Sequence, residues 1–162
     1  MNIHGTRTLD APSEAVFDAI CDPSTLLAVI PGCSEIEQVG DAYHGLIALR
    51  LPGVTGSFRT VVRLVEARPP TFGRLEGEVV GRPGTIRGSA SFRLIEADGR
   101  TTVDYEGQAE LGGPLARLDN RFAEGLAASL IGQGLGNLNA RLQADTAVGA
   151  GSRPPGRGEP AA

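Results

Sequence analysis

The chain has 162 residues, a formal net charge of −4 and 41% hydrophobic residues, of which few are aromatic. This length predicts one domain with its own core, and the negative charge argues against a nucleic-acid-binding surface. We expect neither a membrane span nor a signal peptide, because no apolar run approaches the ~20 residues that cross a bilayer and no charged segment precedes an apolar one near residue 1.

The first third of the chain predicts one strand and two short helices. Residues 2–9 are expected to form the strand. Pro12 suits the first turn of a helix that ends near Ile20. Asp22-Pro23 then starts a second short helix, which Pro31-Gly32 ends.

The middle of the chain alternates apolar and polar residues with a period of two, which predicts strands. The expected strands cover residues 34–39, 43–51, 56–67, 72–80, 85–96 and 101–111. The turn signals between them are Gly40-Asp41, Pro52-Gly53, Pro69-Pro70, Pro83-Gly84 and Asp98-Gly99. Short connections between consecutive strands predict an antiparallel meander.

The last third of the chain predicts a long helix over residues 115–145, opened by Gly112-Gly113-Pro114. The Gly-, Pro- and Ala-rich residues 147–162 are expected to be disordered, which leaves a folded domain of residues 1–146. The element order predicts an α+β fold in which one curved antiparallel sheet of about seven strands wraps around the C-terminal helix.

The two faces of the predicted sheet differ in character. One face carries alternating charges, such as Glu76 and Glu78 opposite Arg87, and is expected to be solvated. The other face is apolar but rich in small residues, namely Gly45, Gly73, Gly77, Gly88, Ala90, Gly107 and Ala109. These residues either bend the strands or leave room for a ligand, and the sequence does not decide between the two.

A helical wheel that starts at Leu115 brings Leu118, Phe122, Leu126 and Leu130 onto one inward stripe, with Gly and polar residues beside it. Small residues on the helix would then face small residues on the sheet across an apolar cavity. The alternative is a helix that sits closer to the sheet and leaves no cavity. The predicted ligand-binding residues are Tyr43, Phe92, Tyr105, Phe122, Gly125, Ser129, Gly132, Gln133, Gly136 and Asn137.

The second short helix is too apolar for one buried face. We expect it to form the mouth of the cavity or a docking surface through Leu26, Leu27, Val29, Ile30, Pro31 and Gly32. The alternative is that these side chains plug the end of the sheet.

No catalytic constellation emerges from the sequence. His4 and His44 are expected to face outward, and they match no metal-ligand spacing with Cys21 and Cys33, which read as small half-buried hydrophobes. Arg7 is in phase with the inward face, so it reaches either the cavity or its rim. We therefore predict no catalytic residues, no metal and no cofactor.

Several stretches resemble the carbon monoxide dehydrogenase G-subunit family, within the START-like (SRPBCC, helix-grip) superfamily that also contains polyketide cyclases and Bet v 1 allergens. They are LDAPSEAVFDAICDPSTLLAVIPGCSEIE, LPGVTGSFRTVVRLVEARPP, IRGSASFRLIE and ELGGPLARLDNRFAEGLAASLIGQ. The Pro31-Gly32-Cys33 turn and Gly112-Gly113-Pro114-Leu115-Ala116 are the most specific parts. The resemblance covers about residues 2–143.

The resemblance implies a helix-grip fold with a deep apolar cavity for a quinone- or lipid-like molecule. It also implies a non-enzymatic accessory protein in the cytoplasm, peripheral to the inner face of the cell membrane, that supports a molybdenum hydroxylase of the carbon monoxide dehydrogenase type. Two alternatives stay open. One is a START-like enzyme of the cyclase or hydrolase kind that acts on a hydrophobic substrate, and the other is an interaction module without a ligand.

Overall fold

The computed structural model describes residues 1–152, with side chains as far as residue 145. Its elements are β1 (Asn2–Leu9), α1 (Ser13–Cys21), α2 (Pro23–Val29), β2 (Cys33–Val39), β3 (Ala42–Leu51), β4 (Val54–Arg68), β5 (Phe72–Gly81), β6 (Gly84–Ala97), β7 (Arg100–Gly112), the 3₁₀ helix η1 (Gly113–Arg117) and α3 (Asn120–Ser152). The order is the predicted one. The long helix begins later than predicted and also runs past the predicted domain end at residue 146, while residues 153–162 of the predicted tail lie outside the described residues.

The seven strands form one antiparallel sheet in the order β1-β7-β6-β5-β4-β3-β2. Each strand from β2 to β6 pairs with the strand that follows it in the chain, and β1 forms the other edge of the sheet by pairing with β7. Between β6 and β7, Asp98 and Gly99 both have positive φ angles, 56° and 76°, which suits a tight two-residue hairpin turn. The predicted meander and the predicted fold class are therefore confirmed.

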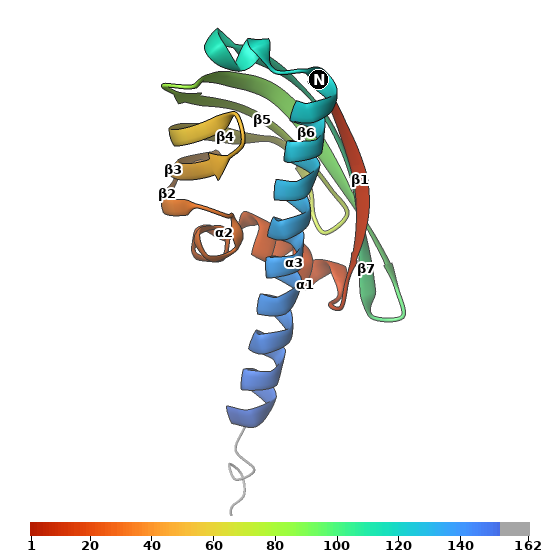
Figure 1. The fold of residues 1–162 in the computed structure, drawn as a ribbon. Coiled ribbons are helices and arrows are strands. Elements are labelled where there is room, and N and C mark those ends of the chain that lie inside the picture. Colours follow the sequence, from red (N-terminus) through yellow and green to blue (C-terminus); the bar gives the residue numbers. More distant parts are fainter. Residues whose placement is uncertain (153–162) are drawn as a thin grey trace, which may run out of the picture.

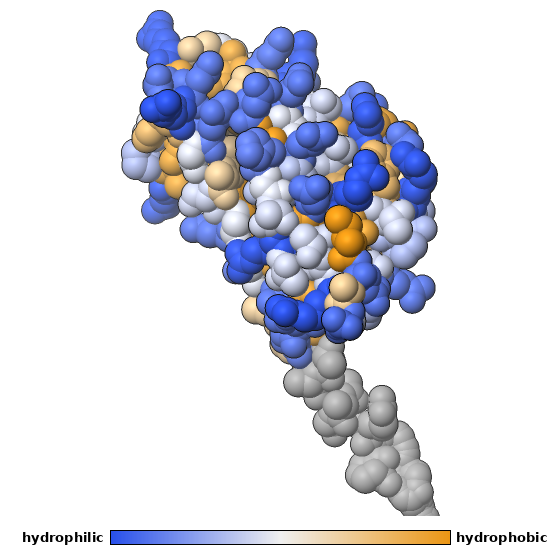
Figure 2. Space-filling view, turned by 90° about the vertical axis from the view of Figure 1, so that its right-hand side faces the viewer, coloured by the Kyte–Doolittle hydropathy of each residue, from blue (hydrophilic) through white to orange (hydrophobic). Residues whose placement is uncertain are grey.

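The sheet curls around the first half of α3, and the second half of this helix continues past the sheet beside α1 and α2 (Figure 1). Its main contacts are with β1, α2 and α1. The outer face of the sheet carries the predicted cross-strand charges, for example Arg87, whose guanidinium lies 3.0 Å from the Glu78 carboxylate. Polar and neutral side chains cover most of the face turned to the viewer in Figure 2.

Two clusters of buried side chains form the core. The larger one centres on Leu9, Val16, Phe92 and Val103, with Leu138 contributed by α3. The smaller one joins Val54, Phe58 and Leu115, so the 3₁₀ helix η1 covers that end of the sheet.

The inward face that the wheel predicted for the long helix is only partly correct. Leu118 and Leu126 pack against the smaller core cluster, as predicted, whereas Phe122 does not. Leu115 belongs to η1, and the chain leaves helical geometry at Leu118 before α3 begins at Asn120, where the Asp119 carboxylate accepts a hydrogen bond from the Phe122 backbone N–H at 3.2 Å. The wheel was thus anchored on residues that precede the helix. The face that α3 buries follows Ala123 and Leu138, while Phe122 is 43% exposed.

Most small residues of the inner sheet face are filled by their neighbours. A Cβ on Gly73 would overlap the Phe92 ring, and a Cβ on Gly107 would lie 2.9 Å from the Ser89 carbonyl oxygen. These glycines therefore allow close approach between neighbouring groups, and they leave no empty space.

Candidate functional site

An apolar pocket of about 470 Å³ lies between the inner face of the sheet, α2 and α3. Its lining includes Phe58 from one core cluster and Phe92, Val103 and Leu138 from the other, so the pocket separates the two clusters. The other lining residues are Ala19, Ile20, Leu26, Val29, Ile30, Pro31, Ile47, Leu49, Leu75, Val79, Ile86, Ala90, Ser91, Tyr105, Leu130, Ile131, Gly134 and Leu135. Only Ser91 and Tyr105 among them carry a polar side chain.

The walls of this pocket are incompletely buried. The sheet residues Leu49, Leu75 and Ile86 and the α3 residues Leu130 and Ile131 all remain half-buried, although each lines the pocket. Protein interiors normally pack at high density, so apolar walls left facing an open space favour an occupant.

Helix α2 forms one wall through Leu26, Val29 and Ile30. Its start is fixed by the Asp22 carboxylate, which accepts hydrogen bonds from the Thr25 backbone N–H at 3.0 Å and from the Thr25 and Ser24 hydroxyls, both at 2.7 Å. Since these bonds favour the ionised form, led by the bond from Ser24, they lower the pKa of Asp22.

The Asp22 cap makes the stability of the protein depend on pH. Asp22→Ala is expected to lower the free energy of unfolding by about 0.5–2 kcal/mol at neutral pH. Because the pKa of Asp22 is lowered in the folded state, this contribution is complete above the ordinary Asp pKa of 3.8 and is lost as the pH falls through the lowered value. Urea unfolding of wild type and Asp22→Ala at several pH values measures the difference, which should shrink below about pH 4; a difference that persists at low pH would contradict this role.

The structure brings together part of the predicted site. Phe92, Tyr105, Leu26, Val29, Ile30 and Pro31 line the pocket. Gly125, Ser129 and Gln133 are exposed on the outer side of α3, so the prediction that they face the interior is wrong. Asn137 is exposed and outside the pocket lining, but its amide points to α2, where it donates a 3.0 Å hydrogen bond to the Val29 carbonyl oxygen. Phe122, Gly132, Gly136, Leu27 and Gly32 also lie outside the pocket lining.

Tyr43 and Arg7 also lie outside the pocket lining, and both make hydrogen bonds elsewhere. The Tyr43 hydroxyl donates a 2.7 Å hydrogen bond to the Cys21 carbonyl oxygen at the end of α1, and burial raises the pKa of Tyr43. Arg7 reaches neither the pocket nor its lining: it donates to the Gly132 carbonyl oxygen at 3.2 Å, and a Cβ on Gly136 would lie 3.2 Å from its guanidinium. Gly136 therefore makes room for Arg7.

Sequence reasoning missed most of the α3 side of the pocket. Leu130, which the wheel placed inward, lines it, but so do Ile131, Leu135, Leu138 and Gly134, for which no inward role was predicted. These residues follow one another at spacings of three and four, so they share one helix face, but the wheel took its inward direction from Leu115 and Leu118, which precede the helix. On the sheet, Ile47, Leu75, Val79 and Ile86 were already signalled by strand alternation.

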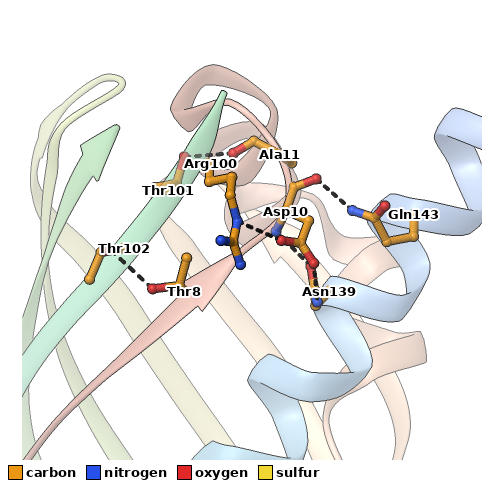
Figure 3. A network of polar contacts seen from close by, with 8 residues as sticks. All are labelled: Thr8, Asp10, Ala11, Arg100, Thr101, Thr102, Asn139 and Gln143. Atoms are coloured by element: carbon orange, nitrogen blue, oxygen red, sulfur yellow. Dashed lines mark hydrogen bonds and ion pairs between the residues drawn. The ribbon is translucent and has the colours of Figure 1, made fainter. Parts of the chain in front are cut away.

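A polar network fastens α3 to the end of β1 (Figure 3). The Asp10 backbone N–H donates to the Asn139 side-chain oxygen at 2.9 Å, and the Asn139 amide donates back to the Asp10 carboxylate at 3.3 Å. Gln143 donates to the Asp10 carbonyl oxygen, and Arg100 Nε lies 2.8 Å from the Asp10 carboxylate. This network holds the α3 wall of the pocket in place from the outside.

The pocket offers little for acid–base or metal chemistry. His4 and His44 are exposed, as predicted, and neither lines the pocket. Over residues 1–145, no three His, Cys, Asp or Glu side chains are placed to hold a metal ion. Cys21 and Cys33 form no disulfide and are half-buried, and burial raises the pKa of both thiols.

No helix in the described part of the chain has the length and apolar character needed to cross a bilayer.

The chain matches a known protein family in sequence and resembles several solved structures in fold. The family of the carbon monoxide dehydrogenase G subunit (CoxG) matches residues 5–143. A conserved protein from Geobacillus kaustophilus is similar with a TM-score of 0.85 and 26% identity, over 88% of this chain and 95% of that one. A START superfamily protein from Mycobacterium smegmatis gives a TM-score of 0.68 at 11% identity, over 88% and 97%. A protein from Thermus thermophilus gives 0.68 at 16% identity, over 90% and 99%. No curated protein matches the chain.

Proposed function

Because the chain belongs to the CoxG family of carbon monoxide dehydrogenase G subunits, we propose that it is a non-enzymatic accessory protein that binds a lipophilic small molecule in the pocket between α2, α3 and the sheet. In this proposal it supports a molybdenum hydroxylase of the carbon monoxide dehydrogenase type at the inner face of the cell membrane. The family supports the accessory role.

The apolar lining of the pocket is the observation that carries the ligand proposal. Backbone and side-chain polar groups that would orient a polar molecule are scarce there. The Gln133 side chain is exposed, and the Asn137 amide is used in its hydrogen bond to the Val29 carbonyl oxygen. A buried carbonyl or hydroxyl group without a hydrogen-bond partner is costly. The pocket therefore suits the hydrocarbon part of a quinone- or lipid-like molecule, with its polar part left at the mouth.

The size of the pocket limits the buried part of this molecule. A volume of about 470 Å³ holds about 15 methylene-sized groups if each takes roughly the 30 Å³ of a liquid water molecule. A medium-length acyl or isoprenoid chain has this size.

Extraction of the purified protein with organic solvent, followed by mass spectrometry, tests the proposal. We expect a stoichiometric hydrophobic molecule from protein purified from its own cells, and less of it from a Gly134→Leu variant, in which a side chain takes up part of the pocket. Absence of such a molecule from both native and recombinant protein would contradict ligand binding and would favour an interaction module without a ligand.

A further inference from the structure

Helix α2 is attached to the rest of the protein in an uneven way. Each end is fixed to the same strand, β3, and its last residue, Val29, accepts the hydrogen bond from α3. Its side chains Leu26, Val29 and Ile30 nevertheless form a wall of the pocket. The arrangement of these attachments determines which movement of α2 breaks the fewest interactions.

The two fixed points lie just before and just after α2. Before it, the Tyr43 hydroxyl in β3 donates to the Cys21 carbonyl oxygen at 2.7 Å. After it, the Ala48 backbone N–H, also in β3, donates to the Gly32 carbonyl oxygen at 2.9 Å. Gly32 has a φ of 79°, and any Cβ there would overlap the Ala48 carbonyl oxygen, so this contact requires glycine.

The tie to α3 is a single hydrogen bond. The Asn137 side-chain amide donates to the Val29 carbonyl oxygen at 3.0 Å, and no other hydrogen bond joins α2 and α3 among the described side chains and backbone groups. Val29 is the last residue of α2, so its carbonyl has no partner within the helix and depends on an outside donor or on water. Asn137 is itself exposed, so water can replace the bond when it breaks.

From this geometry we propose that α2 is a movable gate of the pocket, which we call the door. It rotates about its two contacts with β3, at Tyr43 and Ala48, and the hydrogen bond from Asn137, which we call the latch, holds it closed against α3. The inference rests on the proposed function, since it names the route by which the lipophilic ligand enters and leaves. Rotation of residues 22–31 about the two β3 contacts separates Val29 from Asn137 and opens the pocket between α2 and α3. It also withdraws the Val29 side chain, which is 6% exposed, from the larger core cluster that includes Leu138 of α3. Both hinge contacts survive this rotation, and the Asp10–Asn139 network keeps α3 on β1.

Gln133 provides a matched control for the latch, because it carries the same side-chain amide on the same helix but is exposed and lies outside the pocket lining. Stopped-flow fluorescence with the uncharged dye N-phenyl-naphthylamine measures binding and release. We expect Asn137→Ala to speed both by about two- to tenfold, the change that one net hydrogen bond allows, with a smaller change in Kd. Gln133→Ala is expected to leave both rates unchanged. Wild-type rates in Asn137→Ala, or equal acceleration by Gln133→Ala, would contradict the proposal that α2 is the door.

Hydrogen exchange of the ligand-free protein separates this inference from the proposed function. The backbone amides of α2 are expected to exchange about two- to tenfold faster in Asn137→Ala than in wild type or Gln133→Ala. This result would support the door even if the wild-type protein bound no dye, an outcome that would count against the proposed function alone. Unchanged hydrogen exchange of the α2 amides in Asn137→Ala would contradict the proposal that α2 is the door.

Discussion

Replacing Gly134 with Leu is expected to weaken the binding of an uncharged lipophilic probe roughly a hundredfold. Gly134 lines the pocket from α3, and the nearest group to a Cβ placed there is the Val29 carbonyl oxygen, 3.9 Å away, which is an ordinary contact distance. Leu adds four carbons to the pocket and displaces about as many from the ligand, at about 0.8 kcal/mol each. The resulting loss of about 3 kcal/mol is roughly two orders of magnitude in Kd. Titration with N-phenyl-naphthylamine measures it.

Gly132→Leu is the matched control for this prediction. The same substitution on the same helix adds a side chain outside the pocket lining, where a Cβ meets nothing within 4 Å. Both variants replace a helical glycine and should be more stable than wild type by about 0.5–1 kcal/mol, so unfolding cannot explain a loss of binding in one of them. Loss of binding in Gly132→Leu but not in Gly134→Leu would place the ligand on the other face of α3, which is the face that the sequence predicted.

Replacing Phe58 with Ala is expected to lower the free energy of unfolding by about 3–5 kcal/mol, the usual cost of removing a buried aromatic ring. Phe58 is 1% exposed and joins Val54 and Leu115 in the smaller core cluster. Because it also lines the pocket, the deleted ring adds to a space that is already open, and neighbouring side chains have little to collapse onto. Urea unfolding followed by circular dichroism measures the change.

Phe122 gives the comparison for Phe58. Its side chain is 43% exposed at the start of α3, so Phe122→Ala is expected to cost less than about 1 kcal/mol. The sequence predicted that Phe122 faces the interior, and this assignment would make the two substitutions similar. A large loss of stability in Phe122→Ala, or a small one in Phe58→Ala, would contradict the packing described above.

The sequence by itself determined the elements and the sheet. Alternation along β5, β6 and β7 separated the inner from the outer face, and turn residues such as Asp98 and Gly99 marked where each strand ends. These signals are local, because side-chain alternation and turn conformation depend on residues a few positions apart. The lining of the pocket includes Phe92 and Tyr105 from strands, together with Leu26 and Ile30 in and directly after α2, and these four are among the residues that the local pattern singled out.

Only the tertiary structure decided which face of α3 looks inward and which small residues leave space. The wheel took its inward direction from Leu115 and Leu118, which precede α3. It therefore faced Leu126 and Leu130 inward correctly but also turned the exposed Phe122 inward and left the rest of the pocket-facing side of α3 out. Likewise, Gly73 and Gly134 look alike in the sequence, but the Phe92 ring covers the first and the second faces an open pocket. What lies against a glycine comes from a distant part of the chain, and local sequence patterns carry no record of that neighbour.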